Sequence, residues 1–230
     1  MKNAESGNIL FYILIGVMML AALSFAVTQG SRDNTQNLNQ DKQRLLATEI
    51  IDYGDTIKKS VDAVRLRGVP LMSLSFADAG LAAAYGTPGT NPPDEIFNSS
   101  GGAAVYKDAA PDALDSVASQ SYIFTAKNEI KDVGTTCAAD ACTELIMMLP
   151  ALKKDLCVAI NAVLGVDNPS GAPPTDSGLD ATPFAGSATA VYADTIGDEA
   201  GSAALAGKTA GCFLDSGTGK YTFYQVLQAR

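Results

Sequence analysis

The residue types that carry most enzyme chemistry are scarce in this chain. Its 230 residues include no histidine, the commonest general base and the commonest metal ligand. One acidic stretch contains side chains whose oxygen atoms could bind a metal ion. Their spacing does not follow the calcium-loop pattern D-x-[DN]-x-[DN]-G, so we interpret this stretch as a solvated loop. No carboxylate pair stands out for glycoside chemistry. We therefore expect no catalytic residue, no metal and no cofactor; the acidic stretch comprises Asp176, Asp180, Asp194, Asp198 and Glu199.

The four cysteines are the second group of residues with a chemical use. Their spacing matches no common zinc finger or ribbon. Behind a membrane-targeting segment, disulfides are favoured over free thiols, because such proteins mature in oxidising compartments. Four cysteines allow three pairings, and the sequence alone does not choose among them. We favour Cys137–Cys142, which would close a tight loop, and Cys157–Cys212, which would tie a helix to a late strand.

The N-terminus carries the strongest pattern in the chain. A polar head, residues 1–7, precedes an apolar run without a charge from Ile9 to Val27. At 1.5 Å per residue this run extends about 28 Å, close to the thickness of the hydrocarbon core of a bilayer. Three interpretations are open: a secretory signal peptide cut after Ala26, a plain single-pass anchor, or a leader that is cut before the apolar helix.

A short hydrophilic leader that ends in Gly7, followed at once by an apolar helix, resembles the class III leader of type IV pilins and type II secretion pseudopilins. This resemblance implies that a prepilin peptidase cuts between Gly7 and Asn8. That family usually has Phe or Met at the position of Asn8 and Glu at the position of Tyr12. The resemblance also implies a filament core formed by Ile9, Leu10, Phe11, Tyr12, Ile13, Leu14, Ile15, Val17, Met18, Leu20, Leu23 and Phe25.

The helical pattern continues beyond the apolar run. Apolar residues recur at steps of three and four and form one stripe, with most charged residues off it. Gly68 and Pro70 mark the end of the helix. A coiled-coil stalk is the alternative, but the stripe is not a sustained heptad, so we favour packing of this half on the head. The stripe consists of Leu38, Leu45, Leu46, Ile50, Tyr53, Ile57, Val61 and Val64.

The remaining chain reads as a head rich in strands and loops. Turn-forming residues dominate the stretches 86–102 and 167–187, which we expect to be loops. A helix is predicted after Pro150, with Gly165 just beyond its end. The last part has the pattern of a hairpin with its turn at residues 215–219. The predicted strands are 103–106, 121–125, 144–149, 188–192, 211–214 and 221–227.

These patterns together predict an α+β fold, in which a long N-terminal helix, with a membrane half and an amphipathic half, packs on an antiparallel β-sheet head. The resemblance implies that the chain crosses the inner membrane once before it enters a cell-surface or periplasmic filament. The predicted divisions are a leader (1–7), a transmembrane or filament-core helix (8–28), its amphipathic continuation (29–68) and a globular head with disulfides (69–230).

The net charge and the predicted order of elements limit the possible functions. The net charge of −9 argues against a nucleic-acid partner, because nucleic acids bind basic surfaces. We expect a structural subunit of a pilus- or pseudopilus-like extracellular filament, a homo-oligomer that can include other pilin-like subunits and assembles through its apolar helix. The alternative is a membrane-anchored or secreted binding protein that does not polymerise. Cleavage after Gly7 favours the first, and cleavage after Ala26, or none, favours the second.

Overall fold

The computed structural model describes residues 6–115, 120–135, 143–186 and 195–230, without the side chains of residues 6–10 and 26–38. The chain divides into two compact units, Met1–Lys42 and Gln43–Arg230. We describe each unit by itself. The predicted pair Cys137–Cys142 and the predicted strand 188–192 lie outside the described residues.

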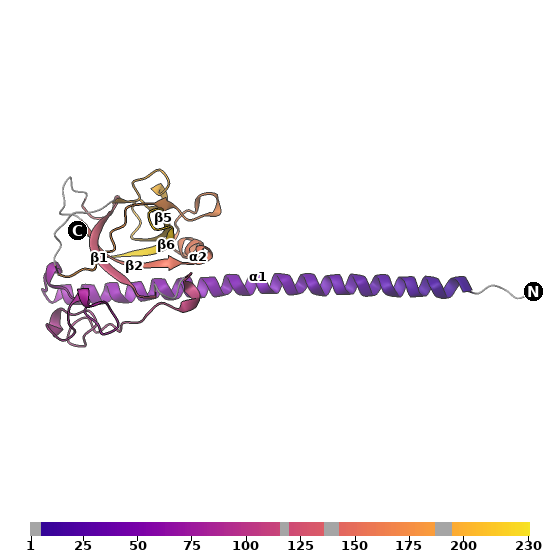
Figure 1. Ribbon diagram of the computed structural model, residues 1–230, viewed down its shortest axis with the longest axis horizontal. Helices are drawn as coiled ribbons and strands as arrows, with labels where there is room; N and C mark the ends of the chain where they lie inside the picture. Colours follow the sequence, from indigo (N-terminus) through magenta and orange to yellow (C-terminus); the bar gives the residue numbers. More distant parts are fainter. Residues whose placement is uncertain (1–5, 116–119, 136–142, 187–194) are drawn as a thin grey trace, which may run out of the picture. The chain divides into compact units, whose positions relative to one another are not determined.

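Helix α1 runs from Ser6 to Leu66 and contributes to both units (Figure 1). The helix ends just before Gly68, the glycine at which the sequence analysis placed its end. Gly68 has φ +91°, a left-handed conformation that costs glycine little, and its N–H donates to the carbonyl of Arg65 at 2.9 Å. Pro70 follows, and the chain cannot continue as a helix.

Within the larger unit, one face of α1 is buried in the main core. The buried side chains recur at the spacing that the sequence predicted, and Ile57, Val61 and Val64 are fully enclosed. Leu45 belongs to the predicted stripe, but 71% of it is exposed, and the side chain of Leu38 lies outside the described residues. The buried residues of this face are Leu46, Ala47, Ile50, Tyr53, Ile57, Val61 and Val64.

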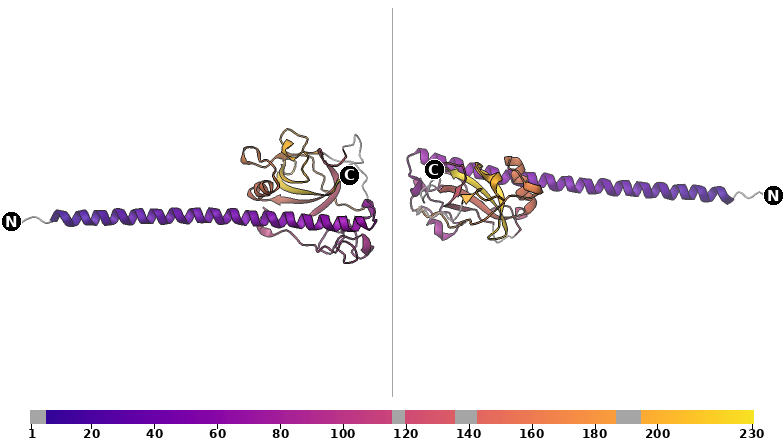
Figure 2. Two further views of the ribbon diagram at one scale, coloured as in Figure 1. Left: turned by 180° about the vertical axis from the view of Figure 1, so that it is seen from behind. Right: turned by 90° about the horizontal axis from the view of Figure 1, so that it is seen from above.

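The chain after α1 runs back along the side of this part of α1 that faces away from the sheet (Figures 1 and 2). The buried Glu95 organises this segment, because its carboxylate accepts hydrogen bonds from the N–H groups of Gly89 and Asn91 and from Asn98 Nδ2. The segment contains only 3₁₀ turns: η1 (Leu71–Ser73), η2 (Ala83–Tyr85), η3 (Pro92–Asp94) and η4 (Pro111–Ala113).

A six-stranded sheet forms the other side of the larger unit, with the order β3-β5-β6-β2-β1-β4. The four central strands are antiparallel neighbours, whereas β4 pairs parallel with β1 and β3 pairs parallel with β5. Helix α2 (Lys154–Leu164) follows β2. The strands are β1 (Ile123–Ile130), β2 (Glu144–Leu152), β3 (Thr175–Asp176), β4 (Thr195–Ile196), β5 (Ala210–Asp215) and β6 (Lys220–Gln228).

The two faces of the sheet line two separate cores. Along β2, Leu145 and Met147 belong to the core shared with α1, while Ile146 and Met148 belong to a second core with Phe213 and Val226. This alternation follows from the period of two residues in a strand. Every one of these β2 side chains is buried, which explains why this strand is almost continuously apolar.

The outer strands β3 and β4 bring the two edges of the sheet close together. Asp176 of β3 accepts a hydrogen bond from the N–H of Gly197, next to β4, at 2.7 Å. Thr175 N–H donates to the carbonyl of Gly201 at 3.1 Å. The sheet is therefore mixed and nearly closes into a barrel around the second core. The predicted purely antiparallel sheet is wrong, because two-residue edge strands arrive in parallel from distant parts of the chain.

The membrane half of the predicted fold also needs correction. Among the residues that the structure describes, no helix is both long enough and apolar enough to cross a membrane. The predictions of a pilin-type transmembrane helix at residues 8–28, and of a localisation that begins with a single pass through the inner membrane, are therefore wrong.

Candidate functional site

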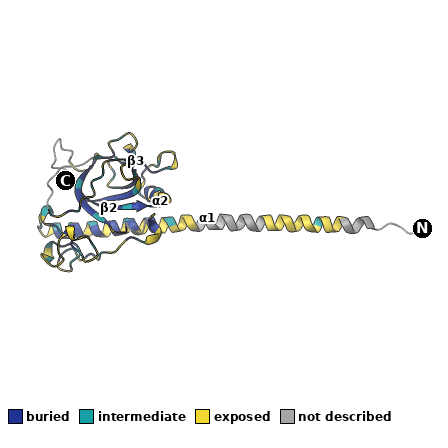
Figure 3. Ribbon diagram, viewed as in Figure 1, coloured by how far each residue is buried: buried dark blue, intermediate teal, exposed yellow. Residues whose placement is uncertain are grey.

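The N-terminal unit presents a large apolar surface on α1. Ten large apolar side chains between residues 11 and 25 are each between 50% and 71% exposed (Figure 3). They occupy all sides of the helix, whereas a helix on the surface of a folded domain has one apolar stripe. A continuous apolar surface of this kind marks an interaction site. Its members are Phe11, Tyr12, Ile13, Leu14, Val17, Met18, Met19, Leu20, Leu23 and Phe25.

The other residues predicted for the filament core are described only in part. Ile15 is half-buried, and the side chains of Ile9 and Leu10 lie outside the described residues. The predicted cleavage site, Gly7–Asn8, falls in the first turn of α1, which begins at Ser6. The first four N–H groups of a helix have no partner within it, so the N–H groups of this turn make no hydrogen bonds inside α1.

One disulfide connects α2 to β5. Cys157 and Cys212 are fully buried in the main core, and their Cα atoms lie 5.4 Å apart. This pair is one of the two that the sequence analysis favoured. Beside it, Asn161 bridges the same elements: its Nδ2 donates to the carbonyl of Cys212 and its Oδ1 accepts from the N–H of Cys212, both at 2.8 Å. The disulfide and this amide pair fix α2 against the sheet.

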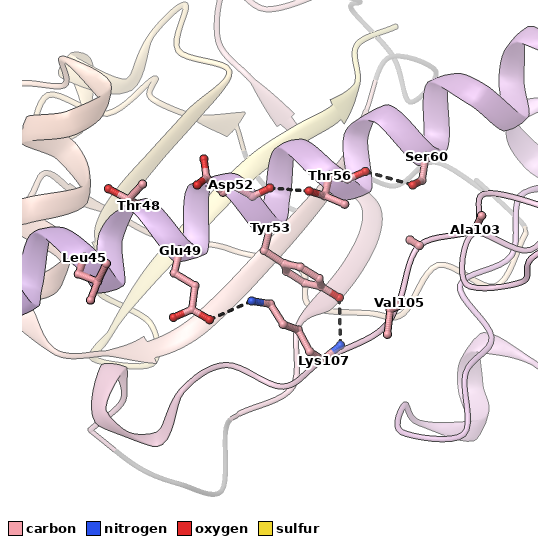
Figure 4. A pocket seen from close by; sticks show the side chains of 11 residues that line it. Leu45, Thr48, Glu49, Asp52, Tyr53, Thr56, Ser60, Ala103, Val105 and Lys107 are labelled. Atoms are coloured by element: carbon pink, nitrogen blue, oxygen red, sulfur yellow. Dashed lines mark hydrogen bonds and ion pairs between the residues drawn. The ribbon is translucent and has the colours of Figure 1, made fainter.

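A groove of about 740 Å³ runs beside the exposed face of α1 in the larger unit (Figure 4). Tyr53 lines it, and its hydroxyl accepts a hydrogen bond from the N–H of Lys107. Lys107 Nζ lies 2.9 Å from Glu49 and 5.2 Å from the centre of the Tyr53 ring. The lining residues are Leu45, Thr48, Glu49, Asp52, Tyr53, Thr56, Ser60, Ala103, Ala104, Val105 and Lys107.

The groove has little of the chemistry that catalysis needs. Burial raises the pKa of Tyr53 to about 12, against the opposing effect of its hydrogen bond from Lys107, so the phenol stays protonated near neutral pH. The ammonium of Lys107 is paired with Glu49. Among the described residues, no group of three or more side chains has the arrangement of a metal site.

Among the buried carboxyl groups of the head, Glu144 and Asp176 have raised pKa values, although Asp176 was expected in a solvated loop. Glu144, at the start of β2, accepts a hydrogen bond from the N–H of Ile130 at 2.9 Å, and its Oε1 has no partner among the described residues. Burial raises the pKa of Glu144 to about 7, and the hydrogen bond from Ile130 acts in the opposite direction. Asp176 is also fully buried, and burial raises its pKa although Gly197 and Ser177 donate N–H bonds to it.

Comparisons of this chain with protein-family models, curated proteins and solved structures find no match. The resemblance to the pilin leader therefore depends on residues 1–30 alone.

Proposed function

We propose that this protein is a structural subunit of a pilus- or pseudopilus-like filament, in which the apolar N-terminal helices of many copies cover one another. The proposal includes cleavage between Gly7 and Asn8 by a prepilin peptidase. The part of the chain that carries the filament would be residues 11–25, and the larger unit would form its outer surface.

The observation that carries the proposal is the exposed apolar surface of α1. Full burial of one large apolar side chain gains about 1.5–3 kcal/mol. Ten side chains that are at least half exposed would therefore gain on the order of 10 kcal/mol or more when they are covered. This gain is comparable to the 4–15 kcal/mol that association costs in lost freedom of motion, and contacts with several neighbours multiply it.

The chemistry of this surface favours other copies of the same helix as the partner. The run from Ile9 to Val27 contains no charged residue, so it offers shape and apolar contact but no ionic recognition. Helices that are apolar on all sides are stable when other helices surround them. The net charge of −9 favours water around the rest of the chain.

A second candidate is a secreted binding protein that does not polymerise, and the groove beside Tyr53 is the observation in its favour. Its chain would start at Val27, after removal of the whole apolar run as a signal peptide. Mass spectrometry of the N-terminal residue of the mature protein separates the two candidates, because the filament subunit would start at Asn8.

Assembly itself can be tested with a charge placed on the apolar surface. We expect the mature chain to form filaments visible by electron microscopy, and Leu20→Lys to abolish them, because a buried unpaired ammonium is costly. Val163→Lys is the matched control, since it places the same charge on an exposed apolar residue of α2. Loss of filaments in both variants, or in neither, would contradict the proposal.

A further inference from the structure

The exposed face of α1 in the larger unit carries a pattern that the core does not explain, apart from Asp55, whose Oδ1 accepts a hydrogen bond from Gln225 Nε2 of β6 at 2.6 Å. Eight exposed residues lie within an arc of about 100° on the helix surface, as 100° per residue dictates. Two of them, Leu45 and Leu66, are large apolar residues that are 71% and 88% exposed. We name this surface the outer stripe; it consists of Leu45, Thr48, Asp52, Asp55, Thr56, Lys59, Ala63 and Leu66.

The outer stripe is symmetric about a point between Asp55 and Thr56. Leu45 and Leu66 lie at equal distances from this point, on opposite sides. Asp52 and Lys59 lie closer to it, again at equal distances and with opposite charges. A helix that packs antiparallel on an identical helix about a two-fold axis at this point brings each residue next to its counterpart.

We propose that the outer stripe is an interface with a second copy of this chain, packed antiparallel about a two-fold axis between Asp55 and Thr56. The contact places Asp52 of each copy beside Lys59 of the other, and Leu45 of each copy beside Leu66 of the other. Thr48 and Ala63 face each other between these contacts. Because of the two-fold axis, the dimer contains two Asp52–Lys59 pairs and two Leu45–Leu66 contacts.

Charge complementarity selects this arrangement over a parallel one. A parallel pair shifted by seven residues also brings Asp52 beside Lys59, but it places Leu45 beside Asp52 and Lys59 beside Leu66. An aspartate or lysine held against leucine loses water without gaining a partner. The antiparallel pair satisfies the charged and apolar residues together.

The size of the stripe predicts a weak dimer. From Leu45 to Leu66 the helix extends about 32 Å at 1.5 Å per residue, so a single helix pair covers less area than a standard protein interface. The groove wall adds Val105, which is 80% exposed and lies beside the stripe. We expect a dissociation constant in the micromolar range, on the scale where 1 μM corresponds to about 8 kcal/mol.

This inference does not rest on the filament proposal, because the stripe begins at Leu45 and uses none of residues 11–25. The test therefore uses the full chain with Leu20→Lys, which blocks filament assembly, and follows its mass by sedimentation equilibrium. We expect a dimer that dissociates on dilution. A monomer at all concentrations up to about 200 μM, well above the expected micromolar range, would overturn the inference whatever the filament experiment shows.

Charge reversal then identifies the contact. In this background, Asp52→Lys and Lys59→Asp each place like charges side by side twice, and each should weaken the dimer at least tenfold. An equimolar mixture of the two variants restores both ion pairs and should form a heterodimer with the affinity of the parent chain. Lys154→Asp, an exposed charge reversal on α2, is the control and should change nothing. Single variants that dimerise like the parent, or a mixture that stays monomeric, would overturn the antiparallel pairing.

Discussion

Two stretches of α1 differ in whether their apolar side chains are buried or exposed to water. Between residues 46 and 64, apolar side chains occupy one face of α1 and are buried by the sheet and by the segment after the helix. Between residues 11 and 25, apolar side chains occupy every face and remain exposed. The apolar face of the first stretch is covered by other residues of the same chain. The second lacks a covering surface among the described residues, and this difference is the basis of the proposed assembly.

If the larger unit is stable through its own contacts, removing one of them should destabilise it. The largest effect is expected for the disulfide. Replacing both Cys157 and Cys212 with alanine should lower the free energy of unfolding by about 4 kcal/mol, because the bond closes a loop with a sequence separation of 55. Urea denaturation of the oxidised parent and of the variant measures the difference. If reduction and substitution left the midpoint unchanged, the α2 contact would not hold this unit together.

A cavity in the buried stretch of α1 should have the next largest effect. Ile57 is fully buried in the main core, and Ile57→Ala should cost about 3 kcal/mol of unfolding free energy. Leu45→Ala on the same helix is the control and should change stability by less than about 0.5 kcal/mol, because Leu45 is mostly exposed. The measurement is urea denaturation of Leu20→Lys protein diluted well below the expected dissociation constant of the dimer, so that Leu45 is not covered by a second copy. Equal losses in the two variants would contradict the assigned burial.

The pKa of Glu144 predicts a smaller, pH-dependent effect. Because the folded-state pKa is raised to about 7 from an unfolded value of about 4.5, stability should fall as the pH rises through this window. Glu144→Gln should remove this dependence and gain about 2 kcal/mol at pH 8, near the order of magnitude that the shift implies. Thermal unfolding at pH 5 and pH 8 measures it. The prediction would be wrong if the parent protein were more stable at pH 8 than at pH 5 and Glu144→Gln abolished this difference.

The smallest effect on stability is expected on the exposed stretch. Leu20→Ala should leave the free energy of unfolding of the larger unit unchanged within about 0.5 kcal/mol, because Leu20 is 70% exposed. The same substitution should raise the concentration needed for filament assembly, which sedimentation of assembled protein measures. A large loss of stability in a monomeric background would show that residues 11–25 already contribute to the folded monomer.

The sequence predicted the elements whose signals are local. The apolar spacing from Leu46 to Val64 matches the buried face of α1. Gly165, predicted just beyond a helix, has φ +66° at the end of α2. The predicted hairpin corresponds to β5 and β6. In each case the residue pattern depends only on neighbours in the chain, so it can be recognised without the rest of the fold.

The features that the sequence did not predict depend on distant contacts. Strands β3 and β4 have two residues each and show no alternating pattern, so their parallel pairing was not recognised. The predicted strand at residues 103–106 does not form, because Ala103 adopts φ +55°, which interrupts an extended backbone. Glu144 begins a run of apolar residues, but only the folded sheet shows that its carboxyl group is buried.

The central claim is that residues 11–25 of one copy are covered by the same residues of other copies. The most direct measurement places a photocrosslinking residue at position 20 in assembled protein that mixes ¹⁴N-labelled and ¹⁵N-labelled chains. We predict crosslinked peptides that join the two isotopic forms between residues 11 and 25. Crosslinks that reach only lipid, detergent or a different protein would contradict the claim.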